Sequence, residues 1–162
     1  TDPTTMNPKP LTRPLPMWIA GGAEAAIQRA AKMSDGWAVV PGWTPNLVKQ
    51  GIAIYQNALR QYERDEGSMD IVLRRDTHLA PTSEAGHREA QTLFENGYRG
   101  FSAEELEQSL IIGGPDECIE YLENMQHAGV TQVLFRCALD EEEQALQTIH
   151  VLGNDVIPHF QQ

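Results

Sequence analysis

The chain has 162 residues, the size of a single domain with its own core, and 41% of them are hydrophobic, which argues against intrinsic disorder. Its 23 acidic residues outnumber the 12 basic ones and give a formal net charge of −11. Such a field repels phosphate backbones and anionic membrane surfaces, so we expect neither nucleic acid nor a membrane as a partner.

Other global features point to a protein of the cytoplasm. Cys118 and Cys137 lie far apart in the sequence and have no companion histidine at metal-ligand spacing, so neither a disulfide framework nor a zinc site is indicated. No apolar run approaches the ~20 residues of a membrane-spanning helix. The segment Thr1–Pro10 lacks the pattern of a secretory signal, and residues 1–16, rich in proline and threonine, are expected to form a linker or an extended segment.

The first predicted elements are a strand, a helix and a second strand. Met17–Ala20 is a short apolar run between a proline and a glycine pair, which is typical of a buried strand. From Ala23 to Met33 small and apolar residues recur on one helical face. Trp37–Val40 is a second short apolar run, and we predict another buried strand there.

A longer helix and a longer strand follow. Thr44 offers a capping hydroxyl before Pro45 at the first helical position, and an apolar stripe then extends to Tyr62. The run Ile71–Ala80 predicts a strand that becomes polar toward its end.

The last third of the chain is predicted to return to the sheet after an insertion. Residues 82–112 are interpreted as a helical insertion. Gly113-Gly114-Pro115 then begins a helix that Gly129 ends. Thr131–Cys137 is a fourth strand, and Asp140 is expected to cap the terminal helix.

This alternation of strands and helices across short turns predicts βα units and a parallel sheet. Four strands can be counted, whereas a complete eight-stranded barrel is typically ~250 residues long. The predicted fold class is therefore α/β, a partial (half) TIM-type β/α barrel with about four parallel strands, formed by residues 17–162.

The sharpest local feature is the turn Ala20-Gly21-Gly22-Ala23 between the first strand and the first helix. Glycines let backbone N–H groups approach a ligand closely, and a helix start adds about half a positive charge, so the turn is a candidate anion or phosphate site. A tight strand-to-helix turn would need the same glycines, and this structural alternative stays open. The chain has neither G-x-G-x-x-G nor G-x-x-x-x-G-K-[ST], so a Rossmann or P-loop site is not supported.

Polar residues mark the carboxyl end of the third predicted strand. Arg74, Asp76 and His78 share one strand parity and lie where barrel enzymes keep catalytic groups. His78 is the candidate catalytic base on this ground. The alternative is that Arg74 and Asp76 pair with each other inside the barrel or at a subunit contact.

The remaining chemical features have structural interpretations. A second glycine pair, Gly113-Gly114, is followed by acidic residues that would repel a phosphate, so it is interpreted as a structural helix start. Three tryptophans near the first two strands could wall an aromatic ring, but core burial explains two of them equally well. The other histidines have no i, i+4 pair, so no metal is expected. These residues are Trp18, Trp37, Trp43, His87, His127, His150 and His159.

Several blocks follow one another in a characteristic order and spacing. They are Pro14-Leu15-Pro16-Met17-Trp18-Ile19-Ala20-Gly21-Gly22, Arg29-Ala30-Ala31, Ser34-Asp35-Gly36-Trp37, Gly113-Gly114-Pro115-Asp116-Glu117-Cys118, Gly129-Val130, Val133-Leu134-Phe135 and Asn154-Asp155-Val156-Ile157-Pro158. Together they resemble the second half of the bacterial-luciferase-like superfamily, whose members are β/α barrels that use FMN or a deazaflavin coenzyme.

The resemblance implies a site and a function. It implies that Ala20, Gly21, Gly22 and Ala23 cradle the cofactor phosphate, and that Val39 and Val40 lie beside the flavin ring. It further implies a flavin- or deazaflavin-dependent oxidoreductase or monooxygenase with a small-molecule substrate, represented by its C-terminal half. Some relatives have a hydroxyl after this turn where the chain has alanine, so phosphate binding would depend on backbone groups.

The first half of the family's barrel has no counterpart in this sequence. A half-barrel leaves two sheet edges unpaired, so we expect self-association or binding to the missing half, and the isolated chain is expected to be inactive. The alternative is a non-catalytic oligomerising half-barrel domain with no bound cofactor. A phosphate-binding α/β domain unrelated to flavins is a weaker option, because the C-terminal blocks argue against it.

Overall fold

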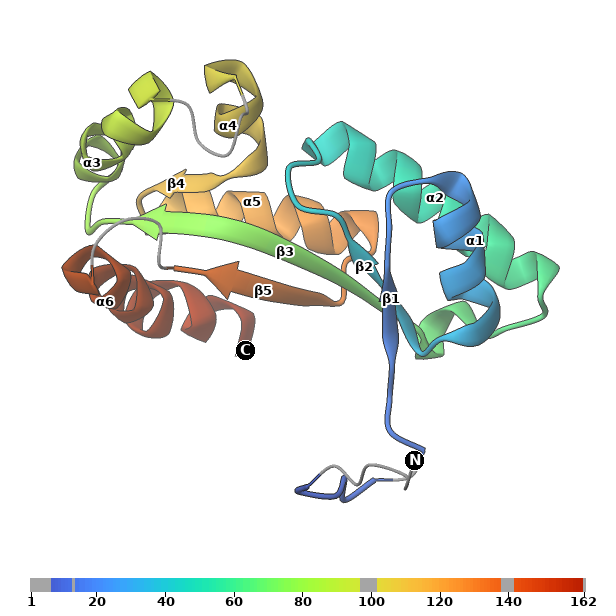
Figure 1. Cartoon of the computed structure of the whole chain (residues 1–162). Coiled ribbons are helices and arrows are strands. Elements are labelled where there is room, and N and C mark those ends of the chain that lie inside the picture. The colour runs from blue at the N-terminus through green and yellow to red at the C-terminus, as the bar shows by residue number, and fades with distance from the viewer. Residues whose placement is uncertain (1–6, 13, 97–101, 138–141, 162) are drawn as a thin grey trace, which may run out of the picture.

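The computed structural model of the chain describes residues 7–12, 14–96, 102–137 and 142–161 (Figure 1). The expected cap Asp140 and parts of the expected N-terminal and insertion segments lie outside these ranges, so the proposed domain limits stay a prediction. The strands are β1 (Trp18–Ala20), β2 (Gly36–Val39), β3 (Asp70–Leu79), β4 (Ile111–Gly113) and β5 (Gln132–Arg136). The helices are α1 (Glu24–Met33), α2 (Pro45–Gln61), α3 (Ser83–Asn96), α4 (Ala103–Ser109), α5 (Pro115–Ala128) and α6 (Glu142–Val151), with the shorter helical segments η1 (Glu66–Ser68), η2 (Leu152–Val156) and η3 (Ile157–Gln161).

The sheet is parallel, as the alternation of elements predicts. β1 pairs with β2, and β2 pairs with the first half of β3. Leu73 of β3 pairs with Val39 of β2 and also with Val133 of β5, so β2 and β5 lie on opposite sides of β3. The order β1-β2-β3-β5 is that of half a barrel, and within the described residues the outer edges of β1 and β5 pair with no strand.

One strand was not anticipated. β4 pairs with the end of β3, from Thr77 opposite Ile111 to Leu79 opposite Gly113, and it begins inside the segment 82–112 that was interpreted as a helical insertion. Before β4, the described part of that segment contains the helices α3 and α4. A strand of three residues directly before a helix shows no period-2 pattern, so sequence periodicity does not separate it from its neighbours.

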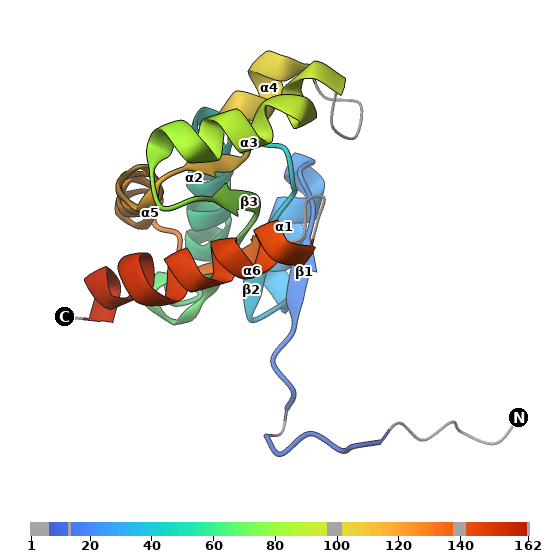
Figure 2. The same cartoon turned by 90° about the vertical axis from the view of Figure 1, so that its left-hand side faces the viewer.

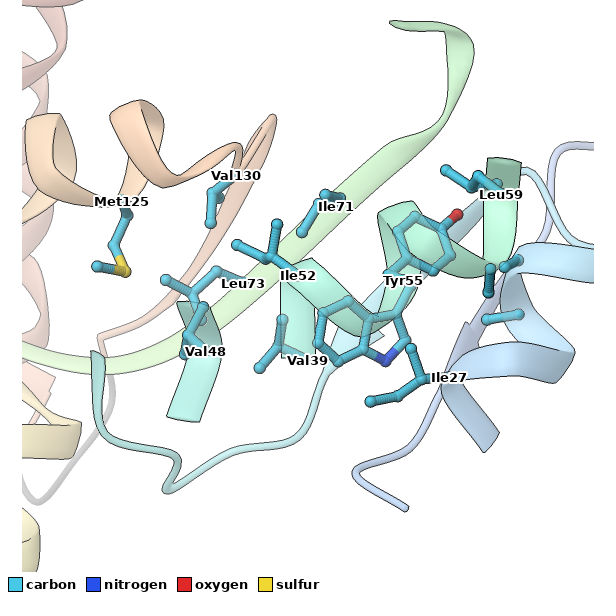
Figure 3. Close-up of a cluster of buried hydrophobic side chains, with 14 residues drawn as sticks. Ile27, Val39, Val48, Ile52, Tyr55, Leu59, Ile71, Leu73, Met125 and Val130 are labelled. Atoms are coloured by element: carbon cyan, nitrogen blue, oxygen red, sulfur yellow. The ribbon is translucent and has the colours of Figure 1, made fainter. Parts of the chain in front are cut away.

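The main hydrophobic core lies between one face of the sheet and helices α1, α2 and α5 (Figure 3). Alternate residues of β2 and β3 point into it, and α2 contributes the apolar stripe that its sequence predicts. Figures 1 and 3 show α1 and α2 beside the β1 and β2 end of the sheet. The core residues include Ile27, Trp37, Val39, Val48, Ile52, Tyr55, Leu59, Ile71, Leu73, Met125 and Val130.

The other face of the sheet, which we call the open face, is exposed at its two outer strands. By strand alternation Trp18 and Leu134 point to this face, and they are 41% and 48% exposed. A closed barrel would enclose this face, because interior and exterior residues alternate along every barrel strand. Exposed apolar side chains at both outer strands therefore agree with the predicted half-barrel.

Two further observations concern the surroundings of the sheet. The segment before β1 extends away from the helices and the sheet (Figure 2). In the part of the chain that the structure describes, no helix combines the length and apolar character needed to cross a bilayer.

Candidate functional site

The turn Ala20-Gly21-Gly22-Ala23 joins the carboxyl end of β1 to the start of α1, as predicted. Ala23 is the N-cap residue of α1 and is exposed. The first N–H groups of a helix have no acceptor within the helix, and the helix dipole concentrates positive charge there. Glu24 brings a carboxylate to the first turn, but it accepts a hydrogen bond of 3.0 Å from Gln28 one turn further along.

Two tryptophans, Trp37 and Trp43, hold this turn in place, and we call them the tryptophan wall. The indole N–H of Trp37 donates to the carbonyl oxygen of Gly21 at 2.9 Å, and Trp37 is fully buried. Trp43 lies against Gly22, where a Cβ would be only 2.8 Å from Trp43 Cζ2. The two indoles meet edge to face, with ring centroids 6.0 Å apart.

The tryptophan wall in turn requires a glycine in α2. A Cβ at Gly51 would lie 2.5 Å from Trp37 Cη2 and 2.6 Å from Trp43 Cζ3. Gly51 therefore lets both rings pack directly against the backbone of α2. Sequence reasoning missed this contact, because a glycine inside a helical pattern gives no sign of what it packs against.

Close packing around the turn explains why both of its glycines lack a side chain. A Cβ at Gly21 would be 2.5 Å from the Cβ of Ala26, and a Cβ at Gly22 would also be 3.1 Å from Val40 Cγ2. These contacts support the structural alternative that the sequence left open. They leave the helix start accessible through Ala23, so the tight turn and an anion site are compatible.

The two valines expected beside a flavin ring have different surroundings. Val39 is buried in the main core against the helices. Val40 follows β2, is partly exposed and adjoins Gly22. The parity of β2 explains the difference, because Val39 shares the face of Trp37.

The open face carries a cluster of charged residues. Arg74 donates to Asp76 at 2.8 Å, which is the pairing that the sequence analysis kept as an alternative. Arg136 of β5 lies opposite Asp76 in the strand register and donates to its other carboxylate oxygen at 3.1 Å. Sequence reasoning missed Arg136, because parity within one strand says nothing about a neighbour 60 residues away.

His78 belongs to a different, buried network. It is 2% exposed, and its Nε2 lies 3.0 Å from Glu89 Oε2 of α3. Gln147 of α6 donates to the same oxygen at 3.0 Å and to the carbonyl oxygen of Leu79 at 3.2 Å. The network ties α3 and α6 to the end of β3.

The second glycine pair is a structural helix start, as interpreted from the sequence. The N–H of Gly114 donates to Glu117 Oε2 at 2.9 Å, and the other oxygen of Glu117 pairs with His87 at 3.0 Å. Burial alone would raise the pKa of Glu117, but hydrogen bonds from Gly114, His87 and Ser83 outweigh it and lower the pKa. A carboxylate thus occupies the position that an anion would need.

Neither metal chemistry nor thiol chemistry is evident in the described residues. No group of three or more His, Cys, Asp or Glu side chains there is arranged to hold a metal ion. Cys118 and Cys137 are free thiols. Burial, reinforced by the nearby Cys137, raises the pKa of Cys118 to about 12, which opposes formation of a reactive thiolate.

Comparison with known proteins places these features in a family. The sequence model of the luciferase-like monooxygenase family matches residues 1–106. No curated protein sequence matches the chain significantly.

Solved structures share the fold at low sequence identity. A monooxygenase from Streptomyces bottropensis superposes with a TM-score of 0.77 at 18% identity, over 98% of this chain and 52% of that chain. The coenzyme F420 dependent tetrahydromethanopterin reductase from Methanopyrus kandleri gives 0.68 at 16%, over 91% and 51%. The oxygenating constituent of 3,6-diketocamphane monooxygenase from Pseudomonas putida, in complex with FMN, gives 0.67 at 14%, over 88% and 48%.

The chain therefore spans about half the length of these three proteins. The superpositions explain the open face and the free edges of β1 and β5, since a full barrel would cover them. With its parallel half-barrel and a family match that covers residues 1–106, the chain belongs to the luciferase-like monooxygenase family.

Proposed function

We propose that the chain is the C-terminal half of a luciferase-like, flavin- or deazaflavin-dependent oxidoreductase, and that the turn Ala20-Gly21-Gly22-Ala23 binds the cofactor phosphate. The observation that carries the proposal is the accessible N-terminus of α1 at the carboxyl end of β1. Ligands of β/α barrels bind at this end of the strands. Among the solved structures with this fold, one contains FMN and another is F420 dependent, which supports a cofactor of this class.

The residues of the turn fit a phosphate group. Helix amides and the helix dipole favour an anion, and Ala23 adds neither bulk nor charge in front of them. The tryptophan wall holds the turn in place before a ligand arrives, so binding costs little conformational entropy at the turn. When bound, a flavin or deazaflavin supplies the redox chemistry, while this chain binds the phosphate, orients the cofactor and helps exclude water.

The proposal includes a partner for the sheet and a small-molecule substrate. Either a second copy of the chain or the other half of a barrel would cover the open face and pair with the outer edges of β1 and β5. We place the substrate on the open face, near the carboxyl ends of the strands, where Arg74, Asp76 and Arg136 cluster. A reducing, cytoplasmic location belongs to the same proposal.

His78 was expected to act as a general base. Its burial and its bond to Glu89 favour a positioning role for the end of β3 instead, because a general base must reach the proton that it removes. Turnover of a His78→Ala variant in the assembled enzyme separates the two roles. A proton-transfer role predicts a loss of kcat with an altered pH profile, whereas a positioning role changes stability and leaves the profile in place.

Two substitutions at one position test the phosphate site. Ala23→Ser and Ala23→Asp each place a capping oxygen at the N-cap of α1, so both should stabilise the protein by about 0.5–2 kcal/mol. Only aspartate adds a negative charge where the phosphate would bind.

The assay is a fluorescence titration with FMN and with a deazaflavin coenzyme. We expect wild type and Ala23→Ser to bind at least one cofactor, and Ala23→Asp to bind it at least about tenfold more weakly although it melts higher. Equal binding by the two variants, or no saturable binding by a well-folded chain, would contradict the proposal.

The second candidate function is a non-catalytic, oligomerising half-barrel domain. The exposure of Trp18 and Leu134 at the two outer strands favours it, because self-association would cover both. A stable, colourless oligomer that does not bind FMN would support this function over the first.

A further inference from the structure

Arg75 of β3 brings a positive charge into the layer between the sheet and the helices. Its residue number places it on the face opposite Arg74, and it is only 1% exposed. Its Nε–H donates to the hydroxyl of Tyr121 at 2.6 Å, and one Nη2–H donates to the carbonyl oxygen of Trp43 at 2.7 Å. A third donor, on Nη1, reaches the carbonyl oxygen of Arg74 at 3.2 Å.

These partners are neutral. Among the described residues, no carboxylate pairs with Arg75, and the guanidinium lies 5.8 Å from the centre of the Tyr121 ring. Burying a cation without a counter-ion carries a large desolvation cost, so an apolar side chain of similar volume would serve packing better. What Arg75 adds is a set of directional donors, of which the Nη2 donor holds the backbone at Trp43.

Trp43 connects Arg75 to the candidate phosphate site. Its carbonyl oxygen accepts the hydrogen bond from Arg75, and its indole is the group that a Cβ at Gly22 would meet first. Gly42, with φ of +84°, turns the chain directly before it. Among the described residues, no side chain other than Arg75 donates to this carbonyl.

We propose that Arg75 is a positioning residue for the phosphate turn. It anchors the Trp43 backbone to β3 and so fixes the ring against which Gly22 rests. The part of this inference that concerns a ligand rests on the proposed function. The part that concerns the turn itself does not.

The test compares two variants that differ in which bond they remove. Arg75→Met keeps a long side chain and removes all three donors. Tyr121→Phe removes the acceptor of Nε only and leaves the bond from Arg75 to Trp43, so it is the matched control. If Arg75→Met fails to fold, Arg75→Lys retains the charge with a single donor group and takes its place in the comparison.

The first readout needs no ligand. Amide hydrogen exchange of the folded proteins should rise about tenfold or more at residues 20–24 and 42–44 in Arg75→Met, with β5 unchanged. Tyr121→Phe should show wild-type exchange in both segments. Equal increases in both variants, an increase spread over the whole chain, or wild-type exchange in Arg75→Met would overturn the inference.

The second readout uses FMN and riboflavin, which differ by the phosphate. In Arg75→Met the ratio of their affinities should fall toward one, whereas a merely structural defect lowers both affinities and preserves the ratio. If the wild-type chain binds neither compound, the proposed function fails. The exchange measurement still decides whether Arg75 positions the turn.

Discussion

Replacing Gly51 with alanine should destabilise the protein, although alanine is the better helix former. In an ordinary helix interior this change gains about 1 kcal/mol. In α2 the new Cβ would lie 2.5 Å from Trp37 Cη2 and 2.6 Å from Trp43 Cζ3, about an ångström closer than carbon atoms pack. Trp37 cannot withdraw freely, because it is fully buried and bonded to Gly21.

The two opposing contributions set the expected magnitude. Overpacking a tight core costs about 1–3 kcal/mol, and two simultaneous ring contacts put Gly51→Ala at the upper end. After the helix gain is subtracted, the net loss in unfolding free energy is about 2 kcal/mol.

Urea unfolding, followed by circular dichroism and tryptophan fluorescence, measures this loss. The control is Gly153→Ala, because Gly153 is exposed, lies in a helical segment and has nothing within 4 Å of a new Cβ. It should be neutral or gain up to about 1 kcal/mol. If both variants gain stability, the tryptophan wall is not packed as described, and its role in holding the turn is refuted.

Three further substitutions test other parts of the structure. Tyr55→Phe should leave the free energy of unfolding unchanged or raise it by up to about 1 kcal/mol, because the hydroxyl is buried without a hydrogen-bond partner in the described residues and burial raises its pKa to about 12. A loss of stability in urea unfolding would contradict this. His78→Ala should cost about 1–3 kcal/mol, since it removes one partner of Glu89 in a part-buried network, and an unchanged urea midpoint would contradict this. Glu117→Gln should cost under about 1 kcal/mol at neutral pH, because that side chain is 42% exposed. The folded-state pKa of Glu117 is lowered, so its stabilisation is present above the unfolded-state pKa and lost as the pH falls through the folded-state value; a difference from wild type that grows toward acid pH would contradict the sign.

Local sequence patterns predicted the elements whose ends are marked by a capping residue or a glycine. The cap expected at Thr44 is present, since its hydroxyl accepts from the N–H of Leu47 at 3.5 Å, and Gly129 ends α5 with φ of +111°. β4 was beyond this reasoning, because what makes it a strand is its pairing with the end of β3.

The sequence predicted where the turn of the candidate site lies, but not which side chains hold that turn in place. The turn between β1 and α1 followed from glycines and a helix start, which are local. Its supports are long-range: Trp43 packs on Gly22, and Arg75 reaches Tyr121 across 46 residues. Such contacts depend on how helices cover the sheet, which no window of sequence contains.

The placement of Val39 shows how two kinds of inference can differ. Strand parity groups it with Trp37, and the structure buries both in the main core. The family resemblance suggested a position beside the flavin ring for the same residue. For side-chain direction within a strand, the alternation of the pleat is the more direct physical argument.

The central claim is that the turn at the start of α1 binds the phosphate of a flavin-type cofactor, and paired titrations of the wild-type chain with FMN and riboflavin test it most directly. The account predicts that FMN binds at least about tenfold more tightly, equivalent to 1.4 kcal/mol, and that Ala23→Asp abolishes the difference. Equal affinity for the two compounds, or a difference that survives in Ala23→Asp, would contradict it.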